Sequence, residues 1–192
     1  MDYLVIDTEF NRVNLSPRGL MSIALVTPYA SYYAVNRHMD TSMRGLDEQS
    51  CNWMLENVWP HLPGGHPNKF SSNWMHPDVK PYATIRREVD AFLRAACPTG
   101  IAKDDIELVA NCGAQDVVRL HTLLSHNDFS KFGPWVPQGA DDMYRIKRAA
   151  YRRGVKKEEL PVQDPQKAHH ALHDAEYELS VVEYIRRRLS EL

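Results

Sequence analysis

Two acidic side chains follow a short apolar run near the start of the chain and could hold a divalent cation together. Asp7 and Glu9 come directly after the apolar residues 3–6. Side chains at positions i and i+2 of a strand point to the same face, so we expect both carboxylates at one place. Two such charges are costly unless a positive charge lies between them, and oxygen ligands favour Mg²⁺ or Mn²⁺. The alternative is a solvated strand end with two surface acids.

A third acid, Asp116, lies near the start of a predicted helix. It follows the predicted strand at residues 106–110 after a short turn that contains Gly113. Acids are favoured in the first turn of a helix by capping and by the helix dipole, which is the simpler interpretation. A catalytic role for Asp116 is the alternative.

A histidine-rich segment, residues 168–175, adds a fourth acid, Asp174, and places His169 five residues before it. Five residues correspond to about 140° around an ideal helix, so the two side chains would converge best if His169 lay at the irregular start of the helix. His169 and His173 are four residues apart and could instead form a zinc-type pair. The sequence offers no third ligand cluster for zinc and no Cys-x-x-Cys motif.

These motifs together resemble a known family signature. Asp7-Thr8-Glu9-Phe10, then Asp116, then His169-x4-Asp174 are similar to the three motifs of DEDD-type (DnaQ-like) 3′–5′ exonucleases of the histidine subclass. Within that group the chain resembles the mycobacterial-type 3′–5′ exoribonuclease domain of bacteria and phages, from residue 3 to about residue 180. Gln115 departs from the pattern, because such domains often have an aromatic residue there. The resemblance implies an α/β ribonuclease H-like fold, with a central mixed β-sheet flanked by α-helices.

The resemblance also implies a reaction. It is metal-dependent hydrolysis at the 3′ end of single-stranded nucleic acid, with RNA favoured and DNA as a further substrate. Asp7, Glu9, Asp116 and Asp174 would hold two ions, Mg²⁺ or Mn²⁺, with Asp7 bridging them. Two such ions activate water, neutralise the phosphate and assist the leaving oxygen. His169 would be the general base, a role that suits an imidazole because it ordinarily titrates near neutral pH.

Four further residues are candidates for substrate contact. Thr8 and Phe10 flank the first acids, and Phe10 could stack on the terminal base or belong to the core. Arg148 and Arg152 belong to residues 145–157, in which seven of thirteen residues are Lys or Arg. That segment could follow a phosphate backbone, or it could be an ordinary solvated helix face.

Two other functions remain open at this point. A ribonuclease H-type endonuclease also uses clustered acids, but it does not need His169 at this spacing. A catalytically silent nucleic-acid-binding domain would need none of the acids. Oligonucleotide digestion separates the three functions. An exonuclease gives a ladder shortened from the 3′ end, an endonuclease gives internal cuts, and a silent binding domain gives no cleavage.

The elements expected to position these residues alternate between strand and helix. Residues 60–80 and 128–139 are rich in Pro, Gly and polar residues and predict irregular surface segments. We predict strands at residues 3–6, 21–27, 31–36 and 106–110, and helices at 47–58, 85–95, 116–124, 143–153 and 169–192. This order predicts one α/β domain, residues 1–192, with helices packed on a single sheet.

Composition narrows the class of protein. The 192 residues include 23 Lys and Arg against 25 Asp and Glu, a net charge of −2, so bulk electrostatics alone would not bind nucleic acid. Hydrophobic content of 43% excludes disordered and collagen-like classes, and no apolar run approaches the length of a membrane span. The start of the chain lacks the basic region of a signal peptide, and the scattered Cys51, Cys97 and Cys112 predict reduced thiols in a cytoplasmic protein. A homodimer is a further expectation, because related exonucleases are often dimers.

Overall fold

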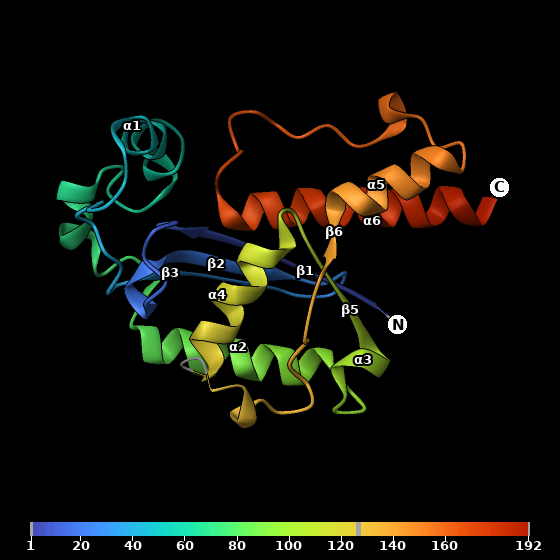
Figure 1. The fold of residues 1–192 in the computed structure, drawn as a ribbon, viewed down its shortest axis with the longest axis horizontal. Helices are drawn as coiled ribbons and strands as arrows, with labels where there is room; N and C mark the ends of the chain where they lie inside the picture. Colours follow the sequence, from blue (N-terminus) through green and yellow to red (C-terminus); the bar gives the residue numbers. More distant parts are fainter. Residues whose placement is uncertain (1, 126–127, 192) are drawn as a thin grey trace.

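The centre of the fold is a mixed β-sheet with helices on both faces (Figure 1). The structure is a computed structural model that describes residues 2–125 and 128–191. Its strands are β1 (Asp2–Phe10), β2 (Leu20–Val26), β3 (Ser31–Asn36), β4 (Val79–Lys80), β5 (Ile106–Ala110) and β6 (Asp141–Asp142). Its helices are α1 (Glu48–Asn57), α2 (Tyr82–Ala96), α3 (Ala102–Asp105), α4 (Gly113–Ser125), α5 (Met143–Arg152) and α6 (Ala171–Glu191).

The sheet has the order β4-β3-β2-β1-β5-β6. β1, β2 and β3 form an antiparallel meander, and the short connection at residues 28–30 joins β2 to β3, whereas β5 lies parallel to β1 on its other side. A parallel neighbour requires a long crossover, and the chain between β3 and β5 supplies α1 and α2. The predicted mixed sheet flanked by helices is therefore confirmed.

β1 lies in the middle of this sheet and is covered on both faces. Leu4 and Ile6 point into the core beneath α2 and α4, whereas Val5 points into the core beneath α5 and α6. All three side chains are fully buried. Because side chains alternate along a strand, Asp7 continues the face of Val5, and Thr8 continues the face of Ile6.

A third hydrophobic cluster lies beside α1, where the sequence predicts an irregular surface segment. Leu62 and Phe70 of the segment 60–80 are buried there beside Trp59, and parts of the segment form short 3₁₀ helices, Trp59–His61 and Pro67–Asn73. The prediction of a surface segment was wrong at these positions because the few apolar residues gather against Val35 of β3. This cluster supports α1, which lies to one side of the two main layers in Figure 1.

Among the described residues, no helix is long and apolar enough to cross a membrane.

The turn between β1 and β2 generates a test of the fold. A Cβ atom on Gly19 would lie 1.7 Å from the carbonyl oxygen of Asn14, which also accepts a hydrogen bond from Arg119 of α4. We therefore expect Gly19→Ala to lower the free energy of unfolding by about 1–3 kcal/mol, as overpacking does. Gly139→Ala is the control, because a Cβ there meets nothing within 4 Å. Equal urea midpoints for the two variants would contradict the close packing of this turn.

Candidate active site

The site forms where β1 continues past the end of its parallel neighbour. β1 pairs with β5 only as far as Val5, opposite Val109, whereas its pairing with β2 continues to Phe10. The strand expected from the apolar run 3–6 and the acids that follow it therefore continues to Phe10, because β2 holds residues 7–10 in the sheet. Since the chain leaves β5 at Ala110 and turns into α4, the second half of β1 has one open edge.

Asp116 occupies that open edge. Its Oδ1 accepts hydrogen bonds from the backbone N–H of Thr8, at 3.0 Å, and from the Thr8 hydroxyl, at 2.6 Å. Both residues are buried, with 3% and 5% of their surfaces exposed. The carboxylate of Asp116 is thus fixed against the strand that carries Asp7 and Glu9. Thr8 thus holds Asp116 in place, and its contact with substrate stays a prediction.

The start of α6 brings His169 and Asp174 to Glu9. Ligand atoms of these three residues all lie within 4.8 Å of one another. The backbone N–H of His169 donates to Asp174 Oδ2 at 3.0 Å, and Gln163 donates to Oδ1. His169 has a φ of 65°, a left-handed conformation that is strained for a residue with a side chain, and the helix begins two residues later. This bend brings together two residues that a regular helix would separate.

The zinc-type pair of His169 and His173 receives no support from this geometry. His169 lies outside the helix, so the two residues are not neighbours on one helical face. The His173 ring stacks instead on His170, with 4.3 Å between ring centroids.

Burial raises the pKa of Asp7, Glu9, Asp116 and Asp174, and repulsion between acids adds to it at Asp7 and Glu9. The pKa values of Asp7 and Glu9 are raised, first by burial and then by neighbouring acids. Burial raises the pKa of Asp116 to about 7, although the hydrogen bonds from Thr8 act in the opposite direction. Burial also raises the pKa of Asp174, against the opposing effect of the His169 N–H. These groups would be stabilised in their charged forms by a cation among them.

The donor atoms fit a divalent cation. Asp7 Oδ2 is buried, and among the described residues it has no hydrogen-bond partner. Carboxylate oxygens on three elements, with an imidazole beside them, make a donor set typical of Mg²⁺ or Mn²⁺. A cation there would satisfy the unpartnered oxygen and offset the repulsion between the acids.

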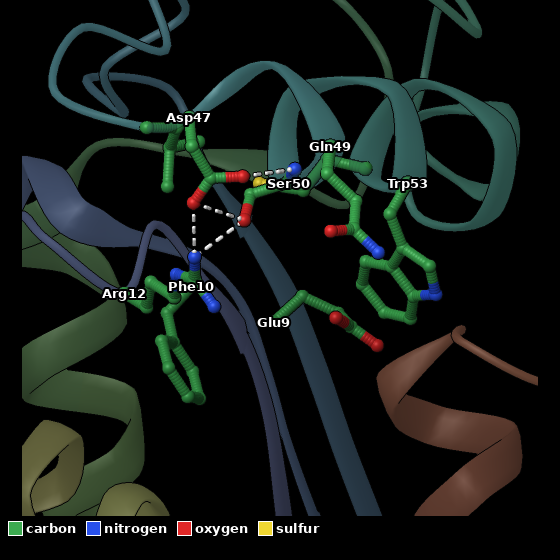
Figure 2. Close-up of a pocket in the computed structure, with 9 residues that line it drawn as sticks. Glu9, Phe10, Arg12, Asp47, Gln49, Ser50 and Trp53 are labelled. Carbon is green, nitrogen blue, oxygen red and sulfur yellow. Dashed lines mark hydrogen bonds and ion pairs between the residues drawn. The ribbon is translucent and has the colours of Figure 1, made fainter.

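A pocket of about 550 Å³ opens beside Glu9 (Figure 2). Its walls come from the end of β1 and from α1, and Glu9 lies between Phe10 and Trp53 in this view. Arg12 closes one side by donating to Asp47 at 2.6 Å and to Ser50. The volume lies within the range of small-molecule sites. The lining residues are Glu9, Phe10, Arg12, Leu46, Asp47, Gln49, Ser50, Trp53 and Met54.

Three residues that the sequence left unassigned support the site. The Trp53 ring meets His169 edge to face, with 4.9 Å between centroids. The buried Arg119 lies beneath the Phe10 ring, at 4.6 Å, and its other contacts hold the turn after β1. Glu178 lies one turn after Asp174, and burial raises its pKa to about 8. Only Glu178 could have been found from spacing, because it shares a helical face with Asp174.

The two expected arginines lie elsewhere. Arg148 and Arg152 are exposed on α5, and no contact with the candidate acids is found among the residues that the structure describes. The α5 cation nearer the site is Lys147, which lies 5.6 Å from the Tyr177 ring. The structure therefore does not bring Arg148 and Arg152 to the carboxylates.

The sheet order and the acids on β1, α4 and α6 define a class of protein, the exonucleases of the ribonuclease H-like fold. Within that class, the chain belongs to the family described as the 3′–5′ exoribonuclease Rv2179c-like domain, whose model matches residues 2–186. This match confirms the resemblance drawn from the sequence. No protein among the curated ones matches.

Solved structures of Exonuclease I share the fold. One Exonuclease I structure has a TM-score of 0.62 at 12% identity, with coverage of 99% of this chain and 42% of that chain. The Escherichia coli enzyme in complex with a 5cy-dA13 oligonucleotide gives a TM-score of 0.59 at 12% identity, with coverage of 97% and 40%. The zinc-bound complex of the E. coli enzyme with single-stranded DNA gives 0.58 at 10%, with coverage of 98% and 41%. This chain thus spans about two fifths of the Exonuclease I chains.

The raised pKa values predict how stability depends on pH. Between its ordinary value and about 7, Asp116 binds more protons in the folded state than in the unfolded state, so folding loses stability as pH rises. We expect the metal-free protein in EDTA to lose on the order of a few kcal/mol of unfolding free energy between pH 5 and pH 8. Urea denaturation measures this change, and Mg²⁺ should restore more stability at pH 8 than at pH 5.

The variant Asp116→Asn provides the control for this prediction, because it removes one titrating group and should make the fall shallower. A metal-free stability that stays level or rises over the same range would contradict the electrostatic description of the site.

Proposed function

We propose that this chain acts as one exonuclease domain that removes nucleotides from the 3′ end of single-stranded RNA, and more slowly from DNA. The observation that carries the proposal is the convergence of Asp7, Glu9, Asp116 and Asp174, with His169 beside Glu9 and Asp174, next to a pocket of about 550 Å³ that Glu9 lines. The family description supports RNA as the substrate. The single-stranded DNA bound in Exonuclease I complexes supports a single-stranded substrate for this chain.

In this proposal the four carboxylates hold two divalent cations, Mg²⁺ or Mn²⁺. When bound, such ions neutralise the phosphate, activate a water molecule and assist the departing 3′-oxygen. The protein contributes rigid ligands. Thr8 fixes Asp116, and the strand β1 fixes Asp7 and Glu9.

His169 is proposed to take the proton from the attacking water. Its backbone is anchored to Asp174, and its ring is braced by Trp53, so the imidazole has a defined position next to Glu9. A general base placed in this way contributes roughly 10²- to 10⁴-fold to the rate.

The pocket is proposed to receive the terminal nucleotide. Phe10 and Trp53 offer aromatic surfaces for the base, and stacking accepts any base. Gln49 offers both a donor and an acceptor in the same wall. Because α1 bounds the pocket, a strand end fits there, which favours an exonuclease over an endonuclease of ribonuclease H type.

Digestion of 5′-labelled single-stranded RNA with Mn²⁺ tests the reaction. We expect a ladder shortened from the 3′ end, and we expect Asp7→Asn to abolish it because one cation ligand loses its charge. His169→Ala should lower kcat by roughly 10²- to 10⁴-fold while Mn²⁺ binding, measured by calorimetry, persists. Asp104→Asn, at an exposed acid on α3, is the control and should retain wild-type activity.

Three results would count against this assignment. Full activity of the Asp7→Asn variant would contradict the cation mechanism. Internal cuts in the RNA would indicate an endonuclease. An inactive His173→Ala variant beside an active His169→Ala variant would show that His173 is the base.

The pocket generates a separate prediction about substrate binding. Stacking on an aromatic ring is worth roughly 1–3 kcal/mol per base, so Trp53→Ala should raise KM by about 5- to 150-fold, and Trp53→Phe should recover most of the loss. Trp74→Ala is a matched control, because Trp74 is 48% exposed against 46% for Trp53, and it does not line this pocket. Equal KM values for the two alanine variants would exclude Trp53 from base binding.

A further inference from the structure

Glu178 is a buried acid that the proposed reaction leaves without a role. It lies on α6, four residues after Asp174, so the two side chains share one face of the helix. Only 3% of its surface is exposed. Its neighbours on the inner face of α6 are apolar, namely Ala175, Leu179 and Val182.

The Glu178 carboxylate lacks the partners that a buried charge requires. The backbone N–H of Asn111, in the turn between β5 and α4, donates a hydrogen bond to it. Its Oε2 atom is buried, and among the described residues it has no hydrogen-bond partner. No described cation lies within ion-pair distance of it, although Lys147 on α5 attracts it from farther away.

The surroundings of Glu178 are those of the cation site. Asp116 and Asp174 repel its carboxylate, and Glu178 in turn acts on Asp7. Glu178 therefore lies within electrostatic reach of acids from all three elements that build the site, β1, α4 and α6. Burying an unpartnered carboxylate costs free energy of folding, and a leucine on this apolar face would avoid that cost.

We propose that Glu178 is a positioning residue of the divalent-cation site, a fifth carboxylate that strengthens cation binding by the other four. It supplies the site with one more negative charge and with an unpartnered acceptor oxygen, in addition to the carboxylates of Asp116 and Asp174. Groups that support metal ligands in this way contribute roughly 10- to 100-fold to metal affinity. The inference rests on the proposed function, because it needs the cation site to exist.

Calorimetric titration of the whole protein with Mn²⁺, without nucleic acid, tests the inference. We expect Glu178→Gln to weaken Mn²⁺ binding by roughly 10- to 100-fold, because it keeps the shape of the side chain but removes the charge. Glu176→Gln is the matched control, because Glu176 is an exposed acid two residues away on the same helix, and its Mn²⁺ affinity should equal that of the wild type.

Unfolding measurements separate this role from a purely structural one. In EDTA, Glu178→Gln and Glu178→Leu should be at least as stable as the wild type, and both should gain less stability from Mn²⁺. If either variant binds Mn²⁺ with wild-type affinity, the inference fails. If Glu178→Gln loses metal-free stability and keeps its affinity, Glu178 is only a structural hydrogen-bonding group.

The same experiment distinguishes failure of this inference from failure of the proposed function. A wild-type protein that binds Mn²⁺ and releases nucleotides, together with a Glu178→Gln variant of equal affinity, overturns the inference alone. A wild-type protein that binds no Mn²⁺ overturns both.

Discussion

The rest of the site depends on the pair of hydrogen bonds from Thr8 to Asp116. They join the centre of the sheet to the start of α4 at the point where β5 has ended, and they turn an open strand edge into a fixed ligand position. Asp7 and Glu9 project from the opposite face of the same strand segment, toward α6. The acids therefore do not rely on loops for their placement. Backbone pairing and the packing of β1 on both faces hold these side chains together despite their mutual repulsion.

In the proposed site, the repulsion between the acids would favour a divalent ion, because a small doubly charged ion satisfies several oxygens together. The same field would oppose the approach of a phosphate until cations are bound. A net charge of −2 is consequently a poor guide to affinity for nucleic acid, because the charge that matters is local, and two divalent ions would offset the charge of the four carboxylates.

Much of this arrangement can be predicted from the sequence, for physical reasons. The period of two along β1 places Asp7 and Glu9 together, and the five-residue spacing of His169 and Asp174 requires an irregular helix start, which the structure has. The pocket could not be predicted, because Trp53 meets His169 across more than a hundred residues and no local pattern encodes that contact. The spacing of Glu178 from Asp174 shows that the two share a helical face, but the burial of Glu178 becomes visible only once the packing of α6 is known.

The third hydrophobic cluster has a consequence for how such a nuclease can diversify. The wall of the pocket formed by α1 is supported by its own small core around Trp59 and Phe70, separate from the two cores that hold the acids. Residues of α1 that face the pocket can therefore be substituted with little strain on the strands that carry the acids. The α1 wall of the pocket and the acids are thus supported by different cores. The contact between Trp53 and His169 is one place where they meet, so a change in this wall would also alter the rate of the proposed reaction.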